Sequence, residues 1–92
     1  MGRVERRLFA IGDELATLAE EERLVSAELE YHRHIADDDE RDAAVSASDF
    51  DRLEAGLSRA DVARFEKRLD AIDRRRAKLE STRLRLLERL DS

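Results

Sequence analysis

Hydrophobic side chains recur along the first part of the chain in alternating steps of four and three residues. The positions are Val4, Leu8, Ile11, Leu15, Leu18, Glu22, Val25, Leu29, His32 and Ala36. This heptad spacing places its members along one stripe of an α-helix, where they can pack against a second helix. Only Glu22 and His32 interrupt the stripe with polar side chains. The pattern predicts a helix over about residues 3–36.

A second stripe with the same spacing lies near the other end of the chain. Its members are Val62, Phe65, Leu69, Ile72, Arg76, Leu79, Arg83, Leu86 and Leu90. They predict a helix over about residues 59–90. Each helix would be roughly 45–50 Å long at about 1.5 Å per residue, and neither could bury its stripe alone. We therefore expect an all-α fold in which the two long helices pack as an antiparallel hairpin or coiled coil.

The segment between the stripes is predicted to contain a break and a short helix. An acidic cluster over residues 37–42 has low helix propensity, so we expect an acidic connector at 37–47. Ser48, followed by Asp51, has the pattern of a helix N-cap with an acidic first turn, which predicts a short helix over about 48–56. Gly56 is placed to end that helix.

The short helix would connect the long helices in the order long, short, long within a single domain spanning residues 1–92. Ser58, followed three residues later by Asp61, resembles a capping box for the last helix. The short helix presents three apolar residues, which we expect to cover two others that lie outside the first stripe. The covering residues are Phe50, Leu53 and Leu57, and the covered ones are Tyr31 and Ile35.

The register of the hairpin follows from which residues face each other. The preferred register places Leu29 opposite Phe65, and the alternative is shifted by one heptad. In both registers Glu22 and Arg76 lie one layer apart. An ion pair between them would fix the register, which is a common role of polar residues at core positions of coiled coils.

Composition supports a helical chain and excludes several classes of site. Of the 92 residues, 45% are charged, 4% are aromatic and none is proline, a balance typical of long helices. The absence of cysteine excludes disulfides and Cys-ligated zinc, and it is compatible with a cytoplasmic location. No apolar run approaches the ~20 residues that span a bilayer, so we expect no membrane contact. The high usage of Ala, Arg, Asp and Leu is typical of a GC-rich, for example actinobacterial, genome.

Net charge and unburied side chains indicate protein partners. A net charge of −5 disfavours direct DNA binding and suits a basic protein partner. Phe9, Leu24 and Leu84 lie off both stripes, so a lone hairpin would leave them exposed. Two-helix hairpins of this size are marginally stable by themselves. We therefore expect a dimer or other homo-oligomer when no partner is bound.

Signals of catalysis or metal binding are weak. The chain has no Gly-rich phosphate loop, no Cys–His pair and no nucleophile elbow, so we expect no enzyme activity. His32 and His34 point about 200° apart on a helix and cannot ligate one ion together. The acidic cluster lacks the spacing of an EF-hand, and we interpret it as a solvated charge run.

Four polar residues on one flank of the first helix form a motif. Glu22, Ser26, Arg33 and Asp37 advance by four, seven and four residues. The motif resembles the signature of the RsiG-type anti-sigma factors, coiled-coil proteins of actinobacteria that bind cyclic di-GMP. That signature has Glu, Ser, Arg, Gln and Asp in order. Here Glu22, Ser26 and Asp37 match, while Leu29 stands in the Arg position and Arg33 in the Gln position.

The second helix carries a fainter copy of the same signature. Its residues are Leu69, Asp73, Arg76, Glu80 and Leu84, of which only Arg76 matches. The resemblance implies an anti-sigma factor that binds a sigma factor and cyclic di-GMP and requires no cofactor. A guanidinium can stack on guanine and bond its O6 and N7 atoms. The ligand-binding residues it implies are Glu22, Ser26, Arg33, Asp37, Asp73, Arg76 and Glu80.

Two other functions are consistent with the same sequence. The hairpin could be a self-associating structural or adaptor module without a nucleotide ligand, in which Glu22 and Arg76 serve only to set the register. A hairpin with an acidic tip also resembles the secondary-channel factors of RNA polymerase (Gre type). That resemblance implies a hairpin that binds RNA polymerase.

Overall fold

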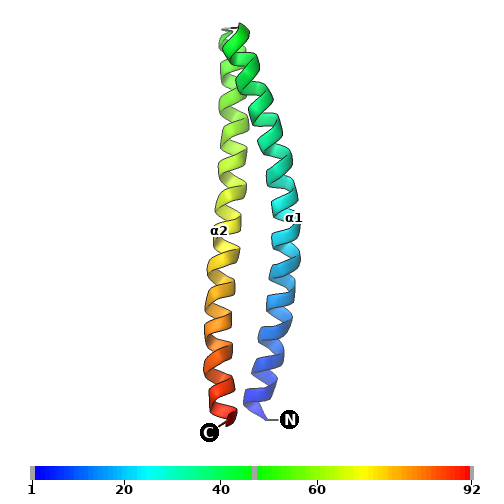
Figure 1. Cartoon of the computed structure of the whole chain (residues 1–92), viewed down its shortest axis with the longest axis vertical. Helices are drawn as coiled ribbons and strands as arrows, with labels where there is room; N and C mark the ends of the chain where they lie inside the picture. Colours follow the sequence, from blue (N-terminus) through cyan, green and yellow to red (C-terminus); the bar gives the residue numbers. More distant parts are fainter. Residues whose placement is uncertain (1, 47, 92) are drawn as a thin grey trace. The chain divides into compact units, whose positions relative to one another are not determined.

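The structure, a computed structural model, describes residues 2–46 and 48–91. Within these residues the chain forms two helices, α1 (Arg3–Ser46) and α2 (Asp49–Asp91), and no strand. The helices pack against each other and run antiparallel (Figure 1). This arrangement confirms the predicted all-α helical hairpin.

The first helix is ten residues longer than predicted, because the acidic cluster lies inside it. α1 continues to Ser46, so the acidic connector predicted at 37–47 is wrong over its described part, and Ala47 lies outside the described residues. The heptad stripe continues beyond Ala36 through Asp39 and Ala43, both half-buried. An Asp in a helix costs less than about 0.7 kcal/mol relative to Ala, so a solvated acidic turn does not end a helix that packs on one side.

The separate short helix predicted at 48–56 is also wrong, because α2 runs without a break from Asp49 to Asp91. Gly56 lies within α2 and does not end it; a glycine inside a helix costs about 1 kcal/mol, which a long packed helix tolerates. The stripe on α2 extends back from Val62 through Ser58 and Ala55 to Asp51. Because these core residues are small or polar, a search for large hydrophobic residues at heptad spacing does not find them. The order is therefore long helix, turn, long helix.

The turn between the helices is capped at the predicted residue. The Asp51 backbone N–H donates to Ser48 Oγ at 3.4 Å, and the Arg52 N–H donates to the Ser48 carbonyl at 3.1 Å. Ser48 is thus an N-cap, as predicted, but it caps the long helix α2 and not a short one. Ser58 is not a cap, contrary to the prediction. Its hydroxyl donates to the carboxylate of Asp39 and so connects α2 to α1.

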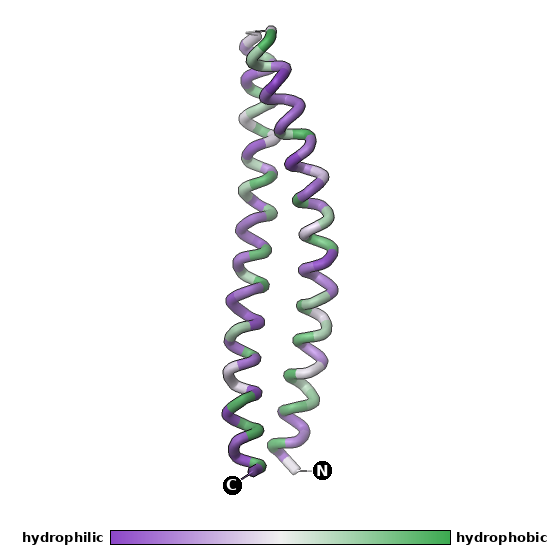
Figure 2. Tube along the Cα trace, in the orientation of Figure 1, coloured by the Kyte–Doolittle hydropathy of each residue, from purple (hydrophilic) through white to green (hydrophobic). Residues whose placement is uncertain are grey.

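The chain divides into two compact units, each built from parts of both helices. The terminal unit consists of residues 1–23 and 70–92, and the turn unit consists of residues 24–69. The buried residues of the terminal unit are Ile11, Leu18, Ile72, Leu79 and Leu86. Those of the turn unit are Val25, Leu29, Ala36, Ala55 and Phe65. Figure 2 shows the hydrophobic segments recurring among hydrophilic ones along both helices.

The core of each unit is a single thin layer. Its side chains keep between 3% and 9% of their surface exposed, and no described side chain is completely buried. In the turn unit, the ring of His32 stacks on Phe65 with 4.8 Å between ring centroids. Phe65 therefore lies against His32, three residues beyond its predicted partner Leu29. The observed register therefore lies between the two predicted registers. In a coiled coil, a core side chain of one helix inserts between residues of the facing helix and does not lie directly opposite one of them.

Candidate functional site

The residues predicted to bind a ligand are divided between the two units. Glu22, Asp73, Arg76 and Glu80 belong to the terminal unit, and Ser26, Arg33 and Asp37 belong to the turn unit. Among the described residues of this set, the ion pairs and hydrogen bonds join only Glu22 to Arg76. Asp73, Glu80, Ser26 and Asp37 are exposed.

Glu22 and Arg76 form the ion pair that the sequence predicts. Glu22 Oε2 contacts Arg76 Nη2, and the two side chains are 36% and 30% exposed. Glu22 Oε2 is itself buried, and its contact with Arg76 does not have the alignment of a hydrogen bond. The pair occupies core positions of both helices in the terminal unit. Each charge is neutralised by the other, so a ligand would have to displace one partner to reach the second.

Arg33, the other arginine of the predicted set, is also paired. Its Nη2 atom lies 3.5 Å from Glu66 Oε2 in the turn unit, and both side chains are more than half exposed. A second ion pair of the same kind joins Arg59 to Glu40 at 2.6 Å. Exposed pairs of this type contribute about 0.2–1 kcal/mol each. They supplement the thin core of the turn unit.

The His32 ring packs against two aromatic side chains. Its ring is stacked on Phe65, and Tyr31 meets it edge-on with 5.6 Å between centroids. The guanidinium groups of Arg64 and Arg68 lie 5.8 and 5.9 Å from the centroid of the Phe65 ring. Aromatic and cation–π contacts of this geometry stabilise a packed cluster. No three potential metal ligands come together in the part of the chain that the structure describes.

The apolar residues predicted to cover Tyr31 and Ile35 lie instead on the outer surface. Phe50, Leu53 and Leu57 are 66%, 61% and 56% exposed. The core side of this part of α2 carries Asp51, Ala55 and Ser58, so residues spaced between them must point away from α1. Tyr31 consequently remains 64% exposed, and the prediction that it is covered is wrong.

Phe50, Leu53 and Leu57 form one apolar strip, which we call the turn-unit patch. Their spacing of three and four residues aligns them on one face of α2. The carboxylates of Asp49 and Glu54 adjoin this strip in sequence, and Asp49 forms an exposed ion pair with Arg52. Sequence reasoning identified these apolar residues but assigned them to the interior, because it did not recognise the small residues that form the core here.

Charge is distributed unevenly between the units. The terminal unit has eleven acidic and eleven basic residues, whereas the turn unit has twelve acidic and seven basic residues. The whole net charge of −5 therefore belongs to the turn unit. The turn-unit patch therefore lies in the unit that carries the net negative charge of the chain.

The chain has no match among known protein families, curated proteins or solved structures. Neither described helix is long and apolar enough to cross a membrane.

Proposed function

We propose that this chain is a non-enzymatic regulatory hairpin that binds a protein partner through the turn-unit patch. The observation that carries the proposal is the exposure of Phe50, Leu53 and Leu57, each more than half exposed, on one face of a helix. Large apolar side chains that gather on one surface commonly mark interaction sites, whereas single exposed ones do not.

The chemistry of the patch specifies the kind of partner. Phe50, Leu53 and Leu57 occupy positions i, i+3 and i+7 of α2. Apolar residues with this spacing anchor an amphipathic helix in the groove of a partner protein. The net negative charge of the turn unit suits a groove edged by Lys and Arg, since complementary charges raise the association rate and exclude acidic competitors. The resemblance to RsiG-type anti-sigma factors makes a sigma factor the partner class that we propose.

The experiment uses purified sigma factors from the source organism, titrated singly into the chain by calorimetry. We expect one of them to bind, and we expect Phe50→Ser combined with Leu53→Ser to weaken that binding at least tenfold. The matched control is Phe9→Ser combined with Leu84→Ser, because those side chains are equally exposed at 63% and 61% but belong to the terminal unit. Failure of every sigma factor to bind contradicts the proposed partner class.

RNA polymerase is tested in the same assay. A hairpin with an acidic tip could instead bind the polymerase itself, so core enzyme without a sigma factor is titrated in parallel. Binding to core enzyme alone would favour the hairpin that resembles secondary-channel factors, and binding to a sigma factor alone would favour the anti-sigma role.

Self-association is a second candidate function, and exposed apolar residues of the terminal unit favour it. In the terminal unit, Phe9, Leu84 and Leu87 are 63%, 61% and 44% exposed. Gly12 lies one helical turn from Phe9, and a side chain there would meet nothing within 4 Å. Because the terminal unit has balanced charges, two copies can approach through it without net repulsion. Sedimentation of the wild type and of the Phe9→Ser, Leu84→Ser variant tests this function: a dimer that persists in the variant contradicts it.

Binding of cyclic di-GMP stays a prediction from the resemblance. Titration with the nucleotide to millimolar concentration, followed by backbone amide signals of residues 22–37 and 73–80, tests it. Shifts confined to those segments would support it. Unchanged signals would contradict it for the isolated chain, while binding to a sigma factor would be unaffected.

A further inference from the structure

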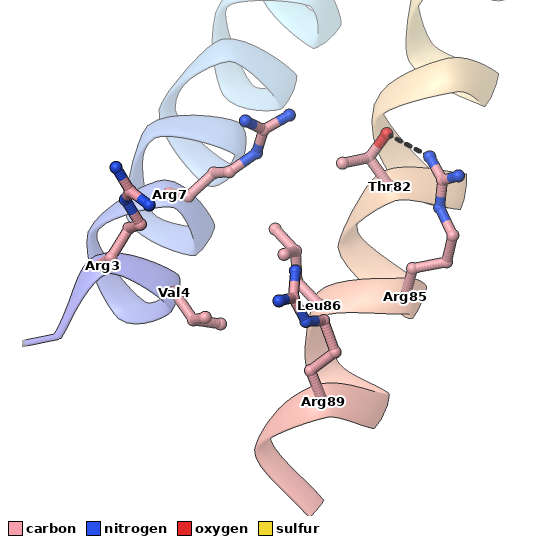
Figure 3. Close-up of a pocket in the computed structure, with 7 residues that line it drawn as sticks. All are labelled: Arg3, Val4, Arg7, Thr82, Arg85, Leu86 and Arg89. Carbon is pink, nitrogen blue, oxygen red and sulfur yellow. Dashed lines mark hydrogen bonds between the residues drawn. The ribbon is translucent and has the colours of Figure 1, made fainter.

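A cavity of about 640 Å³ lies between the two helices of the terminal unit, close to both chain ends. Figure 3 shows the side chains that line it, three from α1 and four from α2. They are Arg3, Val4, Arg7, Thr82, Arg85, Leu86 and Arg89. Four of the seven are arginines, and none is acidic.

The lining of this cavity contains no carboxylate beside its arginines. Arg3, Arg7 and Arg85 form no ion pair with another described residue. Arg85 donates a hydrogen bond to Thr82 Oγ1 at 3.2 Å, a neutral acceptor (Figure 3). Elsewhere in the chain, arginines such as Arg75 and Arg76 have carboxylate partners across the hairpin. Like charges around one space repel each other, so this cluster does not stabilise the fold by itself.

A second cavity, of about 480 Å³, adjoins the first one and shares Arg7, Thr82 and Arg85 with it. It adds the cations Lys78 and Arg75 to its lining. Glu14 is its one carboxylate, and that group accepts two hydrogen bonds from Arg75, at 2.5 and 2.9 Å.

Apolar side chains lie beneath the cationic groups. Val4 and Leu86 line the first cavity, and Ile11 and Leu79 line the second. Ile11, Leu79 and Leu86 belong to the core of the terminal unit, so this lining is fixed by the packing of the two helices. The site thus combines an apolar floor with guanidinium groups at its edges. Such a combination suits a ligand that has both a ring or other uncharged part and several negative charges.

We propose that the two cavities form a binding site for a small organic polyphosphate, of the nucleoside polyphosphate class. Guanidinium groups bind phosphate oxygens through paired N–H donors, and Arg3, Arg7 and Arg85 supply such groups from both helices. The two volumes lie within the range of about 300–1,000 Å³ typical of small-molecule sites. A small anion is favoured over a nucleic acid, because the turn unit, with its net charge of −5, would repel a long polyanion.

This site uses different residues from the turn-unit patch and from the set that the RsiG resemblance implies. The proposal therefore stands or falls independently of the proposed function. It also gives a role to Arg3, Arg7 and Arg85, which line one space in a chain that is acidic as a whole.

The test titrates inorganic tripolyphosphate, adenosine triphosphate and adenosine separately into the full chain at low ionic strength, by calorimetry and amide NMR. We expect both phosphate compounds to bind and to shift the amide signals of residues 3–11 and 78–89. Tighter binding of adenosine triphosphate than of tripolyphosphate would show that the apolar floor contributes. Binding of adenosine alone with the same affinity would contradict the proposal, because the arginines would then play no part.

Substitutions locate the site. Arg7→Gln and Arg85→Gln should each weaken binding of tripolyphosphate about tenfold, the loss expected for one charge-assisted phosphate contact. Arg23→Gln is the matched control, since Arg23 is an exposed arginine of α1 in the same unit but is paired with Glu20. It should change the affinity less than twofold. An equal loss in Arg23→Gln, or no amide shift with millimolar tripolyphosphate, would overturn the proposal.

Stability measurements separate loss of the site from loss of the fold. Arg7→Gln removes one of several mutually repelling charges, so its thermal midpoint should equal or exceed that of the wild type. Arg7→Lys keeps the charge but loses the paired donors, and it should bind tripolyphosphate a few-fold more weakly with an unchanged midpoint. Wild-type affinity in both folded variants would contradict the assignment of Arg7 to the site.

Discussion

The two units of this hairpin use the same heptad spacing but fill it with side chains of different size. The terminal unit buries Ile and Leu residues at its core positions, whereas the turn unit also places Ala36, Ala55 and the half-buried Ser58 there. Where the core is made of small residues, the large apolar residues of the same helix, such as Phe50 and Leu53, are at outer positions. A heptad repeat can therefore build the fold from small core residues while the large apolar side chains of the same helix stay exposed.

The units differ in charge as well. Acidic and basic residues are equal in number in the terminal unit, and the turn unit carries the net charge of −5. Basic residues of the terminal unit gather around a cavity, while acidic residues of the turn unit accompany an apolar patch. We propose that each unit offers a surface for a different kind of ligand.

The largest predicted effect separates core from surface within the turn unit. Phe65→Ala should lower the free energy of unfolding by about 3–5 kcal/mol, because it removes a buried ring on which His32 stacks. Phe50→Ala, the matched control, should change it by less than about 0.5 kcal/mol, since Phe50 is 66% exposed. Urea denaturation measures both. Similar losses in the two variants would mean that Phe50 is part of the core.

The next effect concerns the ion pair of the terminal unit. Glu22→Ala leaves Arg76 in a half-buried position without its carboxylate, and it should cost about 1–2 kcal/mol, between the values for exposed and buried pairs. Arg76→Leu should leave thermal stability unchanged or raise it, because an apolar residue suits a core position. The same variant should loosen the register or change the oligomeric state seen in sedimentation. If neither substitution has an effect in melts or in sedimentation, the pair does not set the register.

A smaller effect distinguishes the real helix cap from the predicted one. Ser48→Ala removes the side chain that accepts from the Asp51 N–H and should cost about 1 kcal/mol. Ser58→Ala removes only a hydrogen bond to Asp39 from the interior of α2 and should cost about 0.5 kcal/mol. Thermal melts of both variants measure the difference. A larger loss at Ser58 would indicate that a helix begins there after all.

The smallest effect depends on pH. Hydrogen bonds from Arg75 hold the pKa of the Glu14 carboxyl below its ordinary value. A lowered pKa in the folded state contributes stability above the ordinary carboxyl pKa, and this contribution is lost as the pH falls through the lowered value. Glu14→Gln should therefore be slightly less stable than the wild type near neutral pH and equal to it at about pH 2. A difference that is independent of pH would show that the charge of Glu14 is not involved.

The sequence predicted the features that depend on large apolar residues and on one specific cap. The two stripes predicted the paired helices, Ser48 predicted a helix cap, and Glu22 with Arg76 predicted an ion pair. The helix ends near Ala36 and Gly56 were wrong, because packing against a partner helix outweighs the modest local cost of Asp and Gly.

The arginine-lined cavity could not be predicted from either helix alone. Arg3 and Arg7 lie about eighty residues from Arg85 in sequence, and only the register of the hairpin brings them to one space. For the same reason, the sequence could not show that the residues implied to bind cyclic di-GMP are divided between the two units. The signal available in the sequence was the concentration of arginines near both chain ends.

We propose that the turn unit binds the protein partner and that the terminal unit does not. The decisive measurement is the affinity of two matched double variants for the sigma factor identified by titration. Phe50→Ser with Leu53→Ser should lose at least tenfold in affinity, and Phe9→Ser with Leu84→Ser should lose less than twofold, since all four side chains are between 61% and 66% exposed. Equal affinity of the two variants, or a greater loss in the second, would contradict the claim.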